Sequence, residues 1–164
     1  MFVICAGMYR SGSTWQYNIA SHLVEQHRGG SRLGFLSAAE FIAKVPSEVP
    51  SEPDSPWQVM KTHDRHDCFA RLAATGQALV ICSYRDLRDV TYSLIPKLRL
   101  TFEEVLFRDR LLDLAMTNDE FWSGQPHTLC QEYGRITSSP VVCIAEIANH
   151  LGIKIGHYEA ASLA

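Results

Sequence analysis

The sequence predicts an α/β protein built as a three-layer, doubly wound parallel sheet with helices on both faces. Short apolar runs of β-forming residues, clearest at residues 2–6 and 78–84, have the continuous hydrophobic character of strands buried on both faces. Segments with helical spacing of apolar residues alternate with these runs along the chain. Because right-handed crossovers make all the strands point the same way, their carboxyl ends meet at one edge, where such sheets bind ligands.

Length and composition fit one domain over residues 1–164. The chain has 164 residues, of which 46% are hydrophobic and 20% charged, and its formal net charge is -3. A mildly acidic chain lacks the strongly basic surface that nucleic-acid binding requires. No stretch approaches the roughly 20 apolar residues of a membrane span. We therefore expect neither a nucleic acid nor a membrane as a partner.

The cysteines indicate a reducing compartment. There are five, no Cys-x-x-Cys pair occurs, and most of them lie in apolar runs. Buried free thiols are therefore expected, rather than a disulfide framework or a zinc site. The first residues also lack the basic segment of a secretory signal peptide, so the predicted location is cytoplasmic.

The N-terminal part of the chain is predicted to fold as strand, glycine-containing turn and helix. After the first strand, apolar residues recur at helical spacing from Trp15 to about His27. A second helix is expected at Ser37, where the letters S-A-A-E form a capping box. Residues 46–56 hold four prolines and several serines, which predicts an irregular surface loop, and residues 57–63 are predicted to form a strand.

The middle of the chain continues this alternation. A helix is predicted over residues 69–74, ending near Gly76, and it is followed by the strand over residues 78–84. The next helix is expected over residues 87–94, with Pro96 ending or kinking it.

The last third begins with a second capping box. Thr101 and Glu104 open one long predicted helix that runs towards Trp122. A strand over residues 128–133 follows, and Pro140 stands at the first position of a final helix.

The turn after the first strand carries the strongest functional signal. Residues 7–15 read G-M-Y-R-S-G-S-T-W, which has the spacing of the phosphate-binding loop GxxxxGK[ST], with Ser13 at the lysine position. Its backbone N–H groups and the following helix N-terminus would surround an anion, and Arg10 supplies a cation. Without the lysine, one terminal phosphate group is expected rather than a triphosphate with magnesium. The alternative is an ordinary turn of small residues.

Two further groups of polar residues follow predicted strands. Arg85 stands at the carboxyl end of one strand, with Ser93 two helical turns later, and the pair would form a second anion site. Lys61 and His63 close another strand, and a neutral histidine is the usual general base. His63 with His66 makes only a weak metal signal, so no metal is expected.

Taken together, the segments RSGSTW, KTH and YRDLRDVTYS resemble the three signature segments of the sulfotransferases that use 3′-phosphoadenosine 5′-phosphosulfate (PAPS). They occur in the order and at the separation usual for that family. A looser match covers the stretch LCQEYGRITSSPVVCIAEIANHLGI. The resemblance implies a P-loop-like fold and transfer of a sulfuryl group to an alcohol or amine, with adenosine 3′,5′-bisphosphate (PAP) as the product.

The resemblance also implies roles for particular residues. His63 would be the general base, while Lys61 and Arg10 would stabilise charge during transfer. Donor binding would fall to the loop, its helix and the second anion site, that is to Arg10, Ser11, Gly12, Ser13, Thr14, Trp15, Arg85, Ser93 and Tyr133.

One family segment is missing from this sequence. Many members carry a late RKGxxGxWK-type segment over the 3′-phosphate, which is absent here, and Arg32, Arg88 or a partner subunit would have to substitute for it. The acceptor is expected to be a small molecule or a carbohydrate, in a site lined by Trp57, Phe35, Leu36 and the proline-rich loop. Two other functions stay open: a P-loop small-molecule kinase that uses ATP, and a non-catalytic nucleotide-binding protein.

Overall fold

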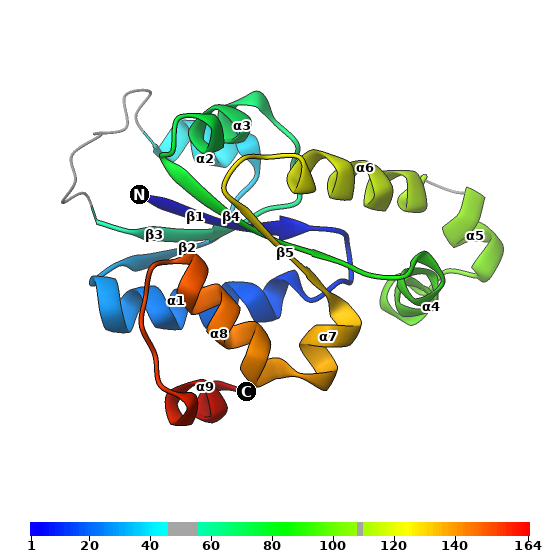
Figure 1. Cartoon of the computed structure of the whole chain (residues 1–164). Coiled ribbons are helices and arrows are strands. Elements are labelled where there is room, and N and C mark those ends of the chain that lie inside the picture. The colour runs from blue at the N-terminus through cyan, green and yellow to red at the C-terminus, as the bar shows by residue number, and fades with distance from the viewer. Residues whose placement is uncertain (46–55, 108–109) are drawn as a thin grey trace.

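A computed structural model shows a five-stranded parallel sheet in the order β2-β3-β1-β4-β5, with helices on both faces (Figure 1). It describes residues 1–45, 56–107 and 110–164. The predicted fold class is therefore confirmed. The strands are β1 (Phe2–Gly7), β2 (Ser31–Phe35), β3 (Gln58–Lys61), β4 (Ala78–Tyr84) and β5 (Thr128–Glu132). The helices are α1 (Ser13–Arg28), α2 (Ala38–Lys44), α3 (Asp67–Ala74), α4 (Leu87–Leu98), α5 (Phe102–Phe107), α6 (Leu111–Ser123), α7 (Tyr133–Ser138), α8 (Pro140–His150) and α9 (His157–Leu163).

The sheet separates two apolar clusters, as its three-layer architecture requires. Alternate side chains of the central strand β1 point to opposite faces, so Ile4 lies in one cluster and Val3 in the other. The Ile4 cluster lies beneath α2, α3 and α6, where Trp122 is fully buried (Figure 1). The Val3 cluster lies against α1, α8 and α9 and includes Leu23 and Ile147. Each such buried side chain contributes roughly 1.5–3 kcal/mol to stability.

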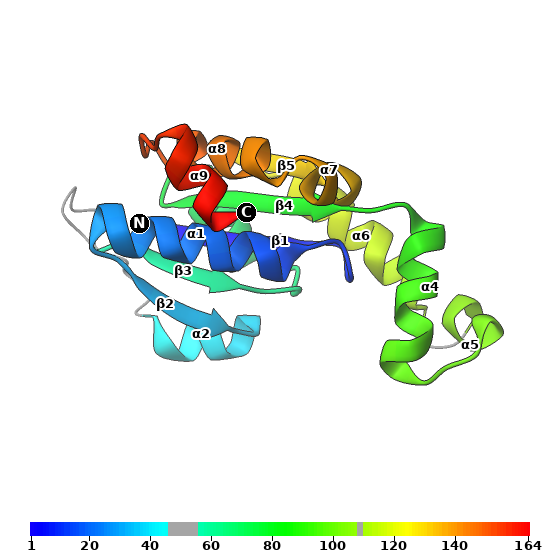
Figure 2. The ribbon, with the colours of Figure 1, turned by 90° about the horizontal axis from the view of Figure 1, so that it is seen from below.

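A third, smaller cluster lies beyond the carboxyl end of β4. Figure 2 shows α4 and α5 extending past the end of the sheet, on the side to which β4 points. Val90, Leu94, Val105 and Ala115 pack there with Met8, which belongs to the turn after β1. The turn is therefore anchored both to the sheet and to these outlying helices.

Both predicted capping boxes are present. The hydroxyl of Ser37 accepts a hydrogen bond from the Glu40 N–H, and the Glu40 carboxylate accepts one from the Ser37 N–H. Thr101 and Glu104 make the same reciprocal pair at the start of α5.

Several predicted boundaries were wrong for local reasons. Pro96 does not end its helix, since α4 continues to Leu98 with Pro96 inside its last turn. The long helix expected after Thr101 is two helices, because Arg110 adopts a left-handed φ of 50° immediately before α6. The short strand β2 and the helices α7 and α9 were not predicted. Most of the proline-rich loop predicted at residues 46–56 lies outside the described residues.

The expectation of free thiols was wrong for one pair. Cys82 of β4 and Cys130 of β5 are direct partners in the parallel register, with Cα atoms 4.7 Å apart, and they form a disulfide. The cause is the pairing of the two strands, which sequence spacing does not reveal. Cys5, Cys68 and Cys143 are free. Within the described residues, no helix is both long and apolar enough to cross a membrane.

Candidate functional site

The turn between β1 and α1 is held tightly against β4. Gly7 has a φ of 111°, and a Cβ at this position would lie 2.3 Å from the carbonyl oxygen of Ser83. The Met8 N–H donates to that same carbonyl at 3.0 Å. The buried hydroxyl of Ser11 lies 2.7 Å from the Met8 carbonyl oxygen and 2.8 Å from the Ser83 hydroxyl. The Ser11 hydroxyl therefore fixes the loop to the sheet.

The N-terminus of α1 is available to an anion. Its N-cap is Gly12, with a left-handed φ of 101°, and no side chain of the described residues caps it with a hydrogen bond. The first N–H groups of this 16-residue helix are the donors that a phosphate group accepts from. A Cβ on Gly12 would lie 3.2 Å from the Tyr133 ring, so the absence of a side chain lets α7 pack over the loop.

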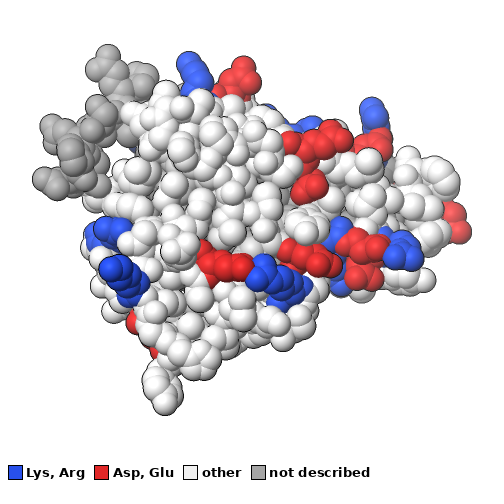
Figure 3. Space-filling model, viewed as in Figure 1, with Lys and Arg blue, Asp and Glu red and all other residues white. Residues whose placement is uncertain are grey.

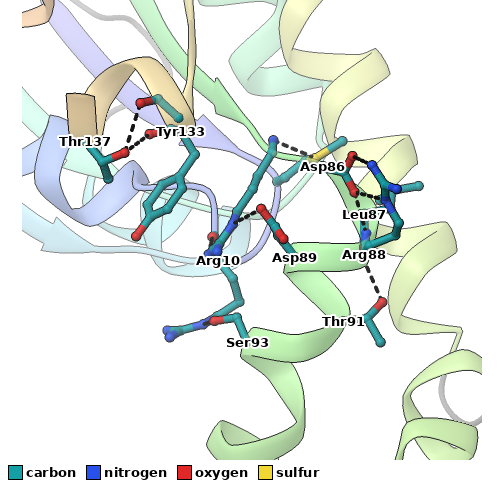
Figure 4. Close-up of polar contacts among 12 residues, drawn as sticks. Arg10, Asp86, Leu87, Arg88, Asp89, Thr91, Ser93, Tyr133 and Thr137 are labelled. Atoms are coloured by element: carbon teal, nitrogen blue, oxygen red, sulfur yellow. Dashed lines mark hydrogen bonds and ion pairs between the residues drawn. The ribbon is translucent and has the colours of Figure 1, made fainter. Parts of the chain in front are cut away.

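Four predicted donor-binding residues from separate segments come together at this edge (Figure 4). Arg10 donates from Nε to the Ser93 hydroxyl at 2.8 Å, and Arg85 donates from Nη1 to the Arg10 carbonyl oxygen at 3.2 Å. The Arg85 guanidinium lies 4.1 Å from the centre of the Tyr133 ring. Its Nε is buried and lacks a hydrogen-bond partner among the described residues, with Asp89 Oδ2 3.7 Å away. Two guanidinium groups and a hydroxyl thus form one cluster, a candidate anion-binding site.

Many other cations of the molecule are already paired. Figure 3 shows several Lys and Arg side chains lying next to Asp and Glu side chains, mainly on the right of the face in view. Arg88 pairs with Asp86, and Arg32 makes two hydrogen bonds to Glu25. Arg32 also stands on β2, near the start of the strand, so the two arginines named above as substitutes in donor binding are both engaged in ion pairs.

His63 follows β3 and contacts Gly7 of the loop. Its Nδ1 is 3.3 Å from the Gly7 carbonyl oxygen and therefore carries the proton, while Nε2 faces the Lys61 ammonium at 3.2 Å. Burial, together with the charge of Lys61, lowers the pKa of His63 to about 4. Burial also lowers the pKa of Lys61. At neutral pH, His63 is therefore an unprotonated base whose accepting nitrogen is Nε2.

A cavity of about 520 Å³ opens beside this base. Its lining residues come from the loop, the segment after β3, and the helices α2 and α6; they are Tyr9, Ala38, His63, Asp64, Arg65, His66, Leu114 and Asn118. The Tyr9 ring lies 4.6 Å from the His63 ring, measured between centroids. A larger cavity of about 790 Å³, between α2 and α3, contains none of the predicted site residues, so the smaller one is the better candidate for an acceptor site.

The structure separates some residues that the sequence placed at the acceptor. Trp57 precedes β3 at its amino end, away from His63, and its ring lies 5.0 Å below the guanidinium of Arg28. Leu36 is only 2% exposed and belongs to the core. Phe35 alone stays near the base, with its ring centre 6.1 Å from that of His63.

Trp15, predicted to stack on the adenine of the donor, lies on the first turn of α1. The side chain is partly buried and packs against the Val3 cluster.

A buried polar network behind the loop has no recognisable signal in the sequence. Gln16 of α1 donates to the Cys82 carbonyl oxygen at 3.2 Å and to Gln131 Oε1 at 3.0 Å. Gln131 in turn donates to the Glu146 carboxylate at 3.0 Å, and Glu146 pairs with Arg135. Isolated glutamines in apolar stretches carry no motif, so only the packing of α1 on β4 and β5 reveals this support.

Metal ligation finds no support in the described residues, which contain no group of three or more His, Cys, Asp or Glu side chains placed to hold an ion. His66, which forms a weak pair with His63 in the sequence, accepts a hydrogen bond from the Cys68 N–H at the start of α3.

Comparison with known proteins identifies the fold. No protein-family model and no curated protein sequence matches the chain. Among solved structures, a retinol dehydratase in complex with androsterone and the inactive cofactor PAP superposes with a TM-score of 0.67 at 18% identity over 99% of this chain. A mouse sulfotransferase complexed with PAP gives a TM-score of 0.68 at 14% identity, also over 99% of this chain. A sulfotransferase from Alicyclobacillus acidocaldarius gives 0.52 at 12% identity, covering 93% of this chain and 81% of that one.

These similarities define the class of structure: the chain has the sulfotransferase fold, a P-loop-like α/β architecture. The chain spans 62% of the length of both the dehydratase and the mouse protein.

Proposed function

We propose that this protein is a sulfotransferase that moves a sulfuryl group from PAPS to an acceptor hydroxyl or amine. One arrangement carries the proposal: an anion-binding cluster and an unprotonated histidine flank the same loop. Arg10 belongs to this loop and contacts Ser93 and Arg85, and His63 is hydrogen-bonded to the Gly7 carbonyl of the same loop. A base beside a phosphate-binding loop is what transfer from an anionic donor to a hydroxyl requires.

The residues present fit the two phosphate groups of the donor. The N–H groups at the start of α1, with Ser13 and Thr14, would hold the 5′-phosphate. Arg85 and Ser93 would bind the 3′-phosphate, and the buried Nε of Arg85 supports this because it lacks a hydrogen-bond partner among the described residues. The adenine would lie against aromatic rings, namely Trp15 and Tyr133.

The chain's own groups would handle the proton and the charge. PAPS supplies the sulfuryl group, whose sulfur bonds to the acceptor oxygen as its bond to the 5′-phosphate oxygen breaks. His63 Nε2 takes the proton of the acceptor hydroxyl, giving up its contact with Lys61 to do so. Arg10 and Lys61 would stabilise the negative charge that develops on the departing phosphate and the transferring group.

Calorimetric titration with PAP, beside ATP and magnesium, tests the donor. We expect PAP to bind more tightly, because the loop has Ser13 where a triphosphate-binding loop has lysine. Tighter binding of ATP with magnesium would favour the alternative of a small-molecule kinase.

A matched pair of variants tests the chemistry. His63→Ala should abolish sulfuryl transfer from PAPS while leaving PAP affinity unchanged, because His63 contacts the loop at the Gly7 carbonyl and the Tyr9 ring, and neither is a predicted donor-binding group. His27→Ala is the control. His27 lies in the last turn of α1 and pairs with Glu159 of α9, so this variant should retain full turnover. Transfer that survives in His63→Ala would overturn the general-base assignment. PAP binding with no transfer in the wild type would favour a non-catalytic nucleotide-binding protein.

A further inference from the structure

One buried polar group in the cavity beside His63 has no structural explanation. Asn118 of α6 lines this cavity and is only 1% exposed. Its side-chain nitrogen, Nδ2, is buried without a hydrogen-bond partner in the described part of the chain. Leaving such a donor unpaired costs roughly 1–3 kcal/mol, so buried amides in folded proteins are normally paired.

A second buried amide in the same protein shows the normal situation. Gln131 is also 1% exposed, but its Nε2 donates to the Cys143 carbonyl oxygen and to Glu146, both at 3.0 Å. The Gln131 amide nitrogen is therefore paired within the buried network behind the loop, and these hydrogen bonds offset the cost of its burial. Asn118 differs because its free N–H groups belong to a residue in the wall of a cavity.

Several neighbouring polar groups of the cavity are already engaged. Asp64 Oδ2 accepts a hydrogen bond from the Ala38 N–H at 2.8 Å, His66 Nδ1 accepts one from the Cys68 N–H, and His63 is held by Gly7 and Lys61. The wall also holds Arg65, which is exposed, and Tyr9, which is partly buried, so solvent reaches both residues. The Asn118 amide differs from them because it is a buried donor that still requires an acceptor atom.

We propose that Asn118 determines acceptor specificity by donating a hydrogen bond from Nδ2 to a second oxygen of the acceptor, away from the hydroxyl that reacts at His63. The inference rests on the proposed sulfotransferase function and deepens it. A purely apolar alcohol would bury the Asn118 amide unpaired, whereas an alcohol with an additional ether or hydroxyl oxygen satisfies it. The substrate class is therefore a small polar alcohol rather than a large hydrocarbon alcohol.

Two probe alcohols of nearly equal shape test this inference. Tetrahydropyran-4-ol and cyclohexanol differ by one ring oxygen, and that oxygen can only accept a hydrogen bond. We expect the wild-type protein with PAP bound to hold tetrahydropyran-4-ol about tenfold more tightly, the low end of what a buried donor discriminates. Nuclear magnetic resonance of ¹⁵N-labelled asparagine should show the Asn118 Nδ2 signal shifting with tetrahydropyran-4-ol and much less with cyclohexanol.

Variants make the test specific. Asn118→Leu should bring the affinity ratio of the two alcohols close to one, while the same substitution at the exposed Asn149 of α8 should leave it unchanged. An unchanged ratio in Asn118→Leu, or a wild-type Asn118 signal that responds to neither alcohol, overturns the inference. The wild-type resonance measurement needs no variant, so a poorly folded Asn118→Leu does not prevent a decision.

Failure of the inference differs from failure of the proposed function. The alcohol titrations are repeated without PAP, and transfer from PAPS is measured separately. A preference for the ether alcohol that depends on Asn118, without PAP binding or transfer, supports the polar site and contradicts the sulfotransferase function. Transfer to both alcohols with equal kcat/KM, and with no response to Asn118→Leu, supports the function and overturns the role of Asn118.

Discussion

Arg10 donates a hydrogen bond from Nε to the hydroxyl of Ser93 at 2.8 Å, across 83 positions of sequence. The contact joins the turn after β1 to α4, so residues of the two predicted anion sites touch each other. Arg85 completes the arrangement by donating to the Arg10 carbonyl oxygen at 3.2 Å.

Removing either side chain of this contact should weaken PAP binding. Arg10→Ala and Ser93→Ala are each expected to lower PAP affinity about tenfold or more, the effect of losing a charge-assisted hydrogen bond. Because the residues contact each other, the double variant should lose less than the product of the single losses. Calorimetric titration with PAP measures all three variants. Arg88→Ala is the control, since Arg88 pairs with Asp86 at the surface, and an equal loss in it would contradict the assignment.

The pH dependence of transfer should follow His63. Burial lowers the pKa of His63 to about 4, and Nε2 can accept a proton only while the ring is neutral. We expect kcat/KM to stay flat as pH falls from 7 to about 5 and then to decrease through a pKa near 4. A profile of kcat/KM against pH, at saturating PAPS, checks this. A decrease centred near pH 6.5, the ordinary value for histidine, would mean that the ring is not buried as described.

The same shift should appear in stability. An unfolded chain protonates His63 near pH 6.5, whereas the folded chain resists protonation until about pH 4, so the unfolded state binds more protons between these values. The free energy of unfolding should therefore fall as pH is lowered across this window, by up to about 3 kcal/mol from His63. Urea denaturation of wild type and His63→Gln between pH 7 and pH 4 isolates the contribution of His63 to the free energy of unfolding. The variant should lack this pH-dependent contribution because glutamine does not titrate. Parallel pH profiles for the two proteins would contradict it.

The sequence predicted the residues whose chemistry depends on a local motif. Gly7, Arg10 and Gly12 have fixed spacing in one turn, so the turn could be inferred without coordinates. Parallel strands bring His63 and Arg85 to the same edge of the sheet, so their position at that edge could be inferred as well. The capping box at Ser37 was equally local.

What could not be predicted depends on packing between distant segments. The Cys82–Cys130 pair requires the register of β4 against β5. The unpaired Asn118 amide requires the position of α6 over a cavity, and the helix break before α6 arises at Arg110, a residue type that rarely adopts a positive φ. Neither the alternation of strands and helices nor any motif encodes these relationships.

A Cβ at Gly7 should destabilise the protein far more than one at Gly34. Both glycines have a positive φ, 111° and 80°, so each alanine variant carries backbone strain of roughly 1–2 kcal/mol. At Gly34 nothing lies within 4 Å of the added atom, whereas at Gly7 the Ser83 carbonyl oxygen lies 2.3 Å away. Urea denaturation should show Gly7→Ala less stable than Gly34→Ala by about 2 kcal/mol or more. Equal stability of the two variants would show that the turn is not packed against β4.

The disulfide between β4 and β5 should stabilise the chain only under oxidising conditions. Cys82 and Cys130 enclose 48 positions of sequence, a loop whose closure restricts the unfolded chain and contributes about 4 kcal/mol at most in the entropy model. Cys130→Ser removes the bond at an exposed position and leaves no cavity in the core. The variant and the reduced wild type should therefore unfold at the same, lower urea concentration, and reductant should not change the variant further.

Alkylation before reduction should label three thiols in the wild type, the free Cys5, Cys68 and Cys143, once the chain is unfolded. Five labelled thiols, together with a urea midpoint that reductant does not move, would show that the pair is not bonded in solution.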